Sequence, residues 1–305
     1  MVDLQGVSKS YGSTVALHPT DLAFANGQTT ALIGPSGCGK STLLRLIIGL
    51  IQPTSGQVIF DGQPVSENNL LEIRRRTGYV IQDGGLFPHL TAEDNVTLVA
   101  KQILHDDLTV EVRQALADRA NDRNPLANDR LRNVMSGSPQ PAIPGGPNIP
   151  IKSENPRSNS SINLRIDLSQ VSKRVAELAE MVRIPKDLLS RYPTELSGGQ
   201  RERISLMRAL MLSPKVLLLD EPLAALDPMV RAALQTDLKR IFEELGTTVI
   251  LVTHDMGEAA YLGQTIVLLR EGKIVQIGKL EDFQKAPKEP FVTEFLNAQR
   301  SLVAL

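Results

Sequence analysis

A glycine-rich segment near the N-terminus has the residue types and spacing of a phosphate-binding loop. It matches the pattern G-x-x-x-x-G-K-[ST] and runs Gly34-Pro35-Ser36-Gly37-Cys38-Gly39-Lys40-Ser41-Thr42. Glycines let the backbone wrap closely around phosphates, with successive N–H groups pointing inward. Lys40 supplies a point charge to the β- and γ-phosphates, and Ser41 supplies an oxygen ligand for Mg²⁺. This segment therefore predicts a nucleoside triphosphate bound together with Mg²⁺.

Two carboxylates follow an apolar run in the second half of the chain. Val216–Leu219 is continuously apolar and is followed directly by Asp220 and Glu221. In a phosphate-loop protein, an Asp at the end of such a strand holds Mg²⁺, often through water. The adjacent Glu221 is then placed to polarise an attacking water. Taken alone, the two acids are equally consistent with a solvated strand end. Together with the phosphate loop, they predict hydrolysis of the nucleotide.

The elements that position these residues follow from the hydrophobic pattern. Strands are expected at Val2–Leu4, Leu17–Phe24, Thr29–Ile33, Gln57–Phe60, Val216–Leu219 and Thr248–Val252. A helix is expected over Ser41–Leu50, and a closing hairpin is expected at Ile266–Leu269 and Lys273–Gln276. The continuous apolar runs suit central parallel strands that are covered on both faces. The predicted fold is α/β, with an antiparallel contribution near the N-terminus.

Composition is that of an ordinary globular protein, with 42% hydrophobic residues, 22% charged residues and a net charge of -1. This charge balance predicts no nucleic-acid partner. No apolar stretch of about 18 residues is present to span a bilayer, and Met1–Tyr11 lacks the apolar core of a secretory signal. We therefore expect a cytoplasmic protein that reaches a membrane only through a partner.

The stretch 106–169 departs from the pattern of the rest of the chain. Ser136–Ser161 is rich in Pro, Ser, Asn and Gly, and it is predicted to be disordered because it cannot bury enough apolar surface. Val110–Ala127 is a candidate weak helix, and Val171–Val182 is predicted to be an amphipathic helix. One domain is therefore expected over 1–105 and 170–301, with 106–169 as an insertion. The insertion could be passive, bind an unknown partner, or be retained non-coding sequence.

Further segments resemble a known family. Leu196-Ser197-Gly198-Gly199-Gln200 resembles the signature sequence of ATP-binding cassette (ABC) proteins. The family's adenine-stacking aromatic, Q-loop, D-loop and switch histidine have counterparts in Tyr11, Gln82, Asp227 and His254. The resemblance covers Val2–Lys101 and Val171–Ser301. It implies a P-loop NTPase fold with a RecA-like core, an N-terminal antiparallel β part and a helical subdomain.

The resemblance also implies that two copies of the chain share each ATP. ATP held by Tyr11 and the loop 34–42 of one copy is expected to be closed over by Ser197–Gln200 of the other, with Asp227 nearby. The backbone N–H groups around Ser197–Gln200 lie at the start of an apolar helix, where they can receive a γ-phosphate. The cofactors are then ATP and Mg²⁺.

The catalytic roles come from the same resemblance. Glu221 is expected to act as general base, and His254 to contact the γ-phosphate and help fix the attacking water. Ser41, Gln82 and Asp220 are the expected Mg²⁺ ligands, and Gln82 is also expected to link the site to a membrane partner. Hydrolysis then removes the γ-phosphate bridge and lets the dimer open.

Within the family, Gly78–Thr91 and Leu251–Ala259 are most similar to importers for quaternary-amine osmolytes such as glycine betaine, carnitine and choline. The implied partners are a second copy of the chain, transmembrane permease subunits and, indirectly, a solute-binding protein. These partners place the chain at the cytoplasmic face of the inner or plasma membrane. Many members carry C-terminal regulatory domains. This chain ends at Leu305, so such regulation is expected to be absent or supplied otherwise.

Other functions remain open at this point. An amino-acid importer, another ABC transporter including an exporter, and a non-transport ABC ATPase are the alternatives. A regulator without turnover is disfavoured because Glu221 and His254 are both present. Cys38 is the single cysteine and is interpreted as a small filler of the loop. The neighbouring Lys40 and helix N-terminus nevertheless favour a lowered thiol pKa, so alkylation is expected to block ATP binding.

Overall fold

The computed structural model describes residues 2–106 and 168–301. By its internal contacts the chain divides into two units, Met1–Leu98 with Ser172–Leu305, and Val99–Val171. The first unit contains both sheets and every predicted site residue. The disorder predicted for Ser136–Ser161 and the weak helix predicted for Val110–Ala127 lie outside the described residues.

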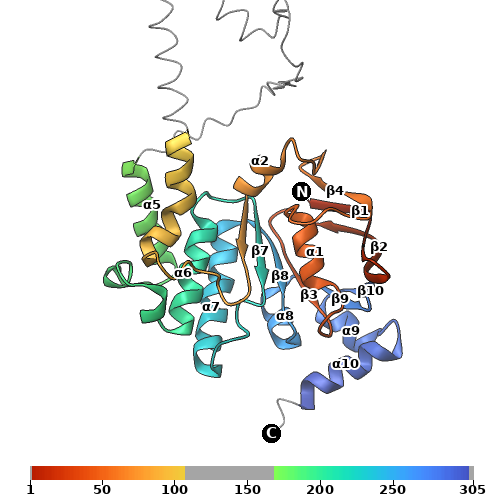
Figure 1. Ribbon diagram of the computed structural model, residues 1–305. Coiled ribbons are helices and arrows are strands. Elements are labelled where there is room, and N and C mark those ends of the chain that lie inside the picture. The colour runs from red at the N-terminus through yellow and green to blue at the C-terminus, as the bar shows by residue number, and fades with distance from the viewer. Residues whose placement is uncertain (1, 107–167, 302–305) are drawn as a thin grey trace, which may run out of the picture. The chain divides into compact units, whose positions relative to one another are not determined.

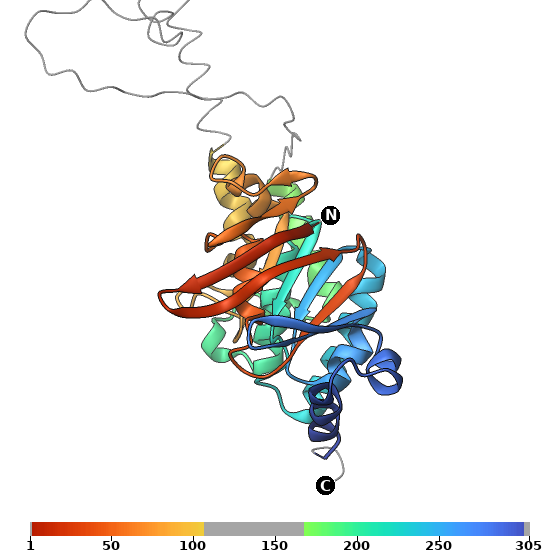
Figure 2. The ribbon, with the colours of Figure 1, turned by 90° about the vertical axis from the view of Figure 1, so that its right-hand side faces the viewer.

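The N-terminal part is a four-stranded antiparallel sheet in the order β2-β1-β4-β5. Its strands are β1 (Val2–Tyr11), β2 (Thr14–Phe24), β4 (Ser55–Phe60) and β5 (Gln63–Pro64). Figure 2 shows β1 and β2 running side by side. The pairing of β1 with β2 continues to Tyr11 through register shifts that begin after Leu4. The expectation that the first strand ends at Leu4 was wrong, because these bulges interrupt the sequence alternation without ending the strand.

The second sheet has six strands in the order β10-β9-β3-β8-β7-β6. Its strands are β3 (Thr29–Ile33), β6 (Thr77–Val80), β7 (Val216–Asp220), β8 (Thr248–Val252), β9 (Thr265–Arg270) and β10 (Lys273–Gly278). All run parallel except β10, which forms the expected closing hairpin with β9. Every residue of β3, β7 and β8 is buried, which confirms the prediction of central strands covered on both faces.

Helices connect and cover the strands (Figure 1). They are α1 (Lys40–Ile47), α2 (Leu70–Arg75), a helix at 92–106, α5 (Leu168–Met181), α6 (Gly198–Leu210), α7 (Pro228–Leu245), α8 (Met256–Leu262), α9 (Leu280–Lys285) and α10 (Pro290–Ser301). α1 ends before the expected Leu50 because Gly49 adopts a left-handed conformation with φ 64°. Among the described helices, none has the length and apolar character needed to cross a membrane.

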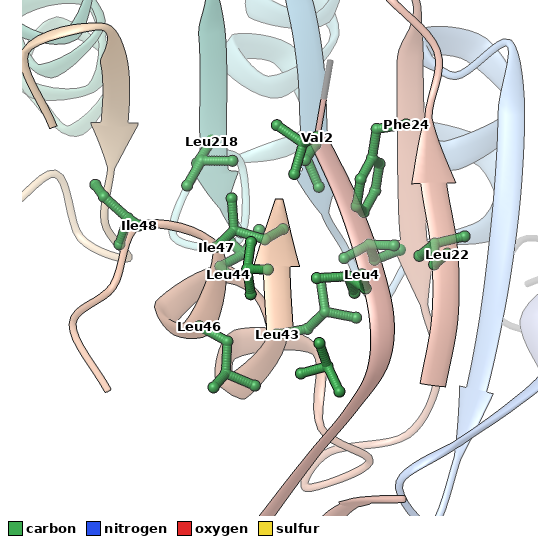
Figure 3. Packing of buried hydrophobic residues seen from close by; sticks show 14 of the residues in the cluster. Val2, Leu4, Leu22, Phe24, Leu43, Leu44, Leu46, Ile47, Ile48 and Leu218 are labelled. Atoms are coloured by element: carbon green, nitrogen blue, oxygen red, sulfur yellow. The ribbon is translucent and has the colours of Figure 1, made fainter. Parts of the chain in front are cut away.

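The helix that carries the phosphate loop is packed between the two sheets. Figure 3 shows Leu43 and Leu44 of α1 among side chains of β1, β2 and β7, including Leu4 and Leu218. β3 alternates between two cores. Leu32 joins this cluster, whereas Ala31 and Ile33 pack in a second cluster with Met256, Phe283 and Val292 of α8, α9 and α10. Burying a Leu or Ile side chain stabilises a fold by about 1.5–3 kcal/mol, so α1 is held firmly from both sides.

Candidate nucleotide-binding site

Neighbouring parallel strands of the six-stranded sheet lead directly into the predicted site segments. β3 precedes Gly34, β6 precedes the Gln82 turn, β7 precedes Glu221, and β8 precedes the His254 loop. The carboxyl ends of neighbouring parallel strands lie along one edge of a sheet, which is where open α/β sheets bind ligands. The sheet order therefore gathers segments that are far apart in the sequence at a single edge.

The phosphate loop depends on glycine where its backbone meets other segments. Gly39 has φ 107°, and a Cβ there would lie 2.7 Å from the carbonyl oxygen of Ala16. A Cβ at Gly34, where φ is 143°, would overlap the carbonyl of Leu269. The N–H of Gly272 donates to the carbonyl of Cys38 at 3.1 Å and fixes the loop from the β9–β10 turn. The loop is thus held between β2 and this hairpin.

Lys40 lies across the inside of this loop. Its side chain is almost completely buried, and Nζ donates to the carbonyls of Gly34 at 2.8 Å and Pro35 at 3.0 Å. Backbone carbonyls rather than a carboxylate receive the ammonium group, so its positive charge is not neutralised by these contacts. That charge is therefore available to an anion bound inside the loop.

Ser41 and Asp220 meet at the start of α1 and the end of β7. The Ser41 hydroxyl donates to Oδ1 of Asp220 at 3.0 Å. Burial raises the pKa of the Asp220 carboxyl, although the hydrogen bond from Ser41 opposes this effect. A hydroxyl and a buried carboxylate are hard oxygen ligands of the kind that Mg²⁺ takes alongside phosphates and water. The two residues therefore fit a magnesium ion, whose charge would compensate the cost of burying the carboxylate.

Glu221 and His254 form a second pair at the same edge. His254 Nδ1 lies 3.4 Å from Glu221 Oε2, and both side chains are partly exposed. The N–H of Glu221 donates to the carbonyl of Val252 at 3.0 Å, which fixes the end of β7 against the end of β8. Glu221 adopts a left-handed backbone conformation with φ 51°. A carboxylate next to an imidazole at a water-accessible edge can accept a proton from water and hold an anion nearby.

The predicted signature segment begins α6 as a capping box. Ser197 Oγ accepts from the N–H of Gln200 at 3.3 Å, and the Gln200 side chain accepts from the N–H of Ser197 at 2.9 Å. Gly198 and Gly199 follow the cap, and a Cβ on Gly199 would lie 2.6 Å from Cγ1 of Val230 in α7. Glycine here allows α6 to begin close against α7.

The signature segment lies apart from the phosphate loop of its own chain. α6 packs on β6, whereas α1 packs on β2, β7 and β8, and Figure 1 shows the two helices on different sides of β7. Within residues 2–106 and 168–301, no hydrogen bond or ion pair joins Ser197–Gln200 to the phosphate loop. This separation is what a site shared between two copies requires.

The remaining predicted residues lie at the surface or cap a helix. Tyr11 ends β1 with 49% of its surface exposed, and its ring lies 5.1 Å from Nζ of Lys9. Gln82 is exposed in the turn after β6. Asp227 caps α7 by accepting from the N–H of Val230 at 3.0 Å. None of these positions conflicts with the expected roles, which stay predictions.

The expected activation of Cys38 was wrong. The thiol is 3% exposed, and burial raises its pKa even though the Lys40 charge lowers it. Desolvation dominates because a buried thiolate loses its hydration, whereas the ammonium of Lys40 is shared with backbone carbonyls. That alkylation blocks ATP binding stays a prediction, and the reaction is expected to be slow.

Two buried acids that no motif pointed to lie next to predicted residues. Glu258 belongs to α8, in the first turn after Asp255, and Glu202 belongs to α6, where Arg201 separates it from the signature segment. The pattern Asp255-x-x-Glu258 was a usable signal, but it is typical of an exposed capping box. Glu202 is buried in α6, which packs against β6, and such packing is not revealed by sequence spacing.

A surface cavity lies away from these residues. It measures about 550 Å³ and is lined by the loops that precede β3, β7 and β8, with Arg174, Lys215 and Asp61 at its wall. Those loops lie at the amino ends of the parallel strands, opposite the edge that gathers the phosphate loop. The shape of the surface alone would therefore point to the wrong end of the sheet.

Comparisons with known proteins agree with the arrangement of residues at the carboxyl edge of the six-stranded sheet. A family model described as ABC transporter matches residues 17–224. The choline transport ATP-binding protein OpuBA of Bacillus subtilis is 34% identical over 98% of this chain and 63% of its own length. A sulfate/thiosulfate import ATP-binding protein of Agrobacterium fabrum is 36% identical over 99% of this chain and 70% of its own length.

A solved structure extends this likeness to three dimensions. The dimeric ABC transporter cassette MJ0796 is 28% identical, with a TM-score of 0.65 over 92% of this chain and 99% of that one. Another structure of it is described as a post-hydrolysis dimer bound to ADP and phosphate. The chain spans 63% of the length of OpuBA and of a related glycine betaine/carnitine/choline transport protein of the same bacterium. The chain belongs to the ABC transporter family, and its described residues have the cassette fold of that family.

Proposed function

We propose that the protein hydrolyses ATP as the energy-coupling subunit of an importer, working as a dimer docked on transmembrane permease subunits. The single observation that carries the proposal is the edge where the Ser41–Asp220 and Glu221–His254 pairs flank the phosphate loop. One pair has the oxygen ligands for Mg²⁺, and the other has a base and an anion-binding group. Phosphoryl transfer to water needs these components in one place.

Each residue has a defined task in this proposal. Lys40 and the N–H groups at the start of α1 bind the β- and γ-phosphates. Ser41 and Asp220 would hold Mg²⁺, which would supply positive charge to the phosphate oxygens. Glu221 accepts the proton of the attacking water, and His254 holds that water and the γ-phosphate in line.

The second copy supplies the other wall of the site. Ser197 keeps its hydroxyl proton free for a γ-phosphate, because Oγ accepts from Gln200 and does not donate to it. The N–H groups of Gly198 and Gly199 are not used by the capping box and are available to the same phosphate. The dimeric MJ0796 cassette supports an arrangement of two facing copies.

Replacing Glu221 by Gln tests the assigned base. The variant keeps the shape of the side chain but cannot accept the proton, so turnover is expected to fall by about 100-fold or more, while ATP binding persists. An ATP-bound dimer should then accumulate, measured by light scattering after gel filtration. Glu243→Gln, an exposed acid of α7, is the matched control and should turn over normally. Wild-type turnover in Glu221→Gln would refute the role.

For the solute, we propose a quaternary amine such as glycine betaine, carnitine or choline. The segments Gly78–Thr91 and Leu251–Ala259 and the two Bacillus subtilis relatives support this choice. Iron(III) and sulfate are the competing candidates for the solute, because an iron(III) import protein of Mesorhizobium japonicum is 33% identical and the sulfate relative is similarly close. Uptake of labelled choline, sulfate and iron(III) by vesicles that hold the chain with its permease decides between them, and uptake of sulfate or iron alone would overturn the choice.

A further inference from the structure

A buried hydrogen-bond network lies directly beneath His254. The hydroxyl of Thr253 donates to Oε2 of Glu258 at 2.6 Å, and the N–H of Asp255 donates to the Thr253 hydroxyl at 3.0 Å. Asp255 in turn accepts from the N–H of Glu258 at 3.0 Å, closing a small ring of contacts around the His254 backbone. Thr253 is 1% exposed and Glu258 is 5% exposed, so water does not compete for the hydrogen bond between their side chains.

The same network is anchored to the central sheet. The N–H of Thr253 donates at 3.1 Å to the carbonyl of Leu32, which lies in β3 two residues before Gly34 of the phosphate loop. Thr253 is therefore held by its backbone on one side and by its side chain on the other. His254 follows immediately, so its position relative to Glu221 depends on how firmly Thr253 is fixed.

Arg231 connects Glu258 to the loop that carries Asp227. Arg231 Nε lies 4.0 Å from Glu258 Oε1, and one of its terminal amino groups donates to the carbonyl of Leu226 at 3.2 Å. Arg231 belongs to the first turn of α7, which Asp227 caps. A contiguous set of polar contacts therefore runs from the carbonyl next to Asp227 to the residue next to His254.

We propose that Glu258 is a positioning residue that holds His254 in place through Thr253 and links it through Arg231 to the loop at Leu226 and Asp227. A buried carboxylate with a hydroxyl on one oxygen and a guanidinium near the other has two fixed partners, so a shift of the Leu226–Asp227 loop is transmitted to Thr253. In the proposed dimer this loop lies close to the shared ATP. Glu258 then makes the position of His254 depend on the arrangement of that loop. The inference rests on the proposed function.

Paired substitutions test the network. Thr253→Val removes the hydroxyl and Thr253→Ser keeps it. Glu258→Leu removes both the acceptor and the charge, whereas Glu258→Gln keeps an acceptor for Thr253. Thr236→Val, at an exposed threonine of α7 whose hydroxyl bonds only its own helix, is the matched control. The measurements are kcat and KM for ATP hydrolysis by the full chain, with circular dichroism to verify folding.

We expect the losses of kcat in the single variants not to multiply when the substitutions are combined. Thr253→Val and Glu258→Leu are each expected to lower kcat by about 10-fold with little change in KM, and the double variant by no more than either alone. Thr253→Ser and Glu258→Gln should recover most of that loss, and Thr236→Val should match the wild type. Arg231→Met should lower kcat by about 3-fold in the wild-type background and have no further effect in Glu258→Leu.

Several results would overturn the proposal. Losses that multiply to about 100-fold, a rise in KM at unchanged kcat, or no rescue by Thr253→Ser would each show that Glu258 does not act through Thr253. If Glu258→Leu fails to fold, the Thr253→Val and Thr253→Ser pair still decides, because it differs by one hydroxyl.

A spectroscopic readout separates this proposal from the function it rests on. The imidazole chemical shifts of His254 should move in Glu258→Leu and stay near wild type in Glu258→Gln. If the wild type shows no ATP hydrolysis but these shifts move as expected, the proposed function fails and the positioning role stands. If ATP hydrolysis by the wild type is normal but the His254 shifts do not move in Glu258→Leu, the positioning role fails and the proposed function stands.

Discussion

The helix N-termini of α1 and α6 were both predicted to bind phosphate, and they are built differently. α1 begins after Gly39, which makes no side-chain cap, and Lys40 lies across the loop in front of it. α6 begins after Ser197, which forms a complete capping box with Gln200. The first terminus leaves its N–H groups to a ligand, whereas the second satisfies part of its own set.

This difference matches the order in which the two termini would meet ATP. The α1 terminus is held between two sheets and is formed in a single chain, so it can bind nucleotide first. The α6 terminus is stable without a ligand because its cap does not depend on one, and it keeps the Ser197 hydroxyl proton and two N–H groups for a phosphate that a second chain brings. The local sequences therefore make the α1 terminus a preformed site for nucleotide and the α6 terminus a self-capped surface that would bind the same nucleotide later.

The largest effect is expected for nucleotide binding by the isolated chain. Lys40→Ala should weaken ATP binding by about 100-fold or more, because contacts to a charged group contribute on the order of 1.5–3 kcal/mol each. Ser197→Ala should leave binding by the monomer within about twofold of wild type, since that residue acts on the other copy's ATP. Fluorescent-nucleotide titration at low protein concentration measures both, and equal losses would remove the distinction between the termini.

Glycine substitutions compare the rigidity of the two termini. Gly39→Ala places Cβ against the Ala16 carbonyl in a left-handed conformation, and it should destabilise folding by about 2–3 kcal/mol. Gly199→Ala meets only Cγ1 of Val230, a side chain that can rotate, and should cost about 1 kcal/mol. Denaturant unfolding gives both values. A larger cost at Gly199 would show that the α6 terminus is the stiffer one.

A buried acid in α6 makes the stability of the fold depend on pH. Burial first, and then the Asp83 carboxylate, raise the pKa of Glu202 from 4.5 to about 7, although Arg201 and Arg208 lower it. Glu202 Oε2 is buried and has no hydrogen-bond partner among residues 2–106 and 168–301. A raised pKa in the folded state means that ionisation is unfavourable there, so stability falls as pH rises from 4.5 to about 7.

Glu202→Gln should remove this dependence. It should stabilise the protein by about 2 kcal/mol at pH 8 and have little effect at pH 4.5. The measurement is the free energy of unfolding of both proteins across that range, with Glu243→Gln as the exposed control. A constant difference between wild type and Glu202→Gln at every pH would contradict the assignment.

The smallest effect is expected from the cap itself. Ser197→Ala removes the acceptor for the Gln200 N–H and should lower stability by about 1 kcal/mol. Ser41→Ala at the α1 terminus should cost less, because Ser41 caps no N–H group and bonds to the Asp220 carboxylate instead. Thermal unfolding of both variants gives the comparison. If Ser41→Ala destabilises the fold more than Ser197→Ala does, the α1 terminus is the one that depends on its serine.

The parts of the fold that sequence reasoning predicted are those fixed by local pattern. The loop between β3 and α1, the end of β7 at Asp220 and the whole of β8 were placed correctly, because apolar runs and glycine spacing are short-range signals. The length of β1 was missed because bulges break its alternation. The raised pKa of Cys38 was missed because burial is a tertiary property that sequence spacing does not measure.

The left-handed backbone conformation of Glu221 lowers thermal stability at a residue that the proposed ATP hydrolysis requires. A side chain other than glycine at φ 51° costs on the order of 1 kcal/mol, which glycine would not incur. A selection for heat resistance that ignores hydrolysis should therefore enrich glycine at position 221 and discard the proposed base. Engineering of this cassette for thermal stability should therefore retain Glu221 if the proposed hydrolysis is to be preserved.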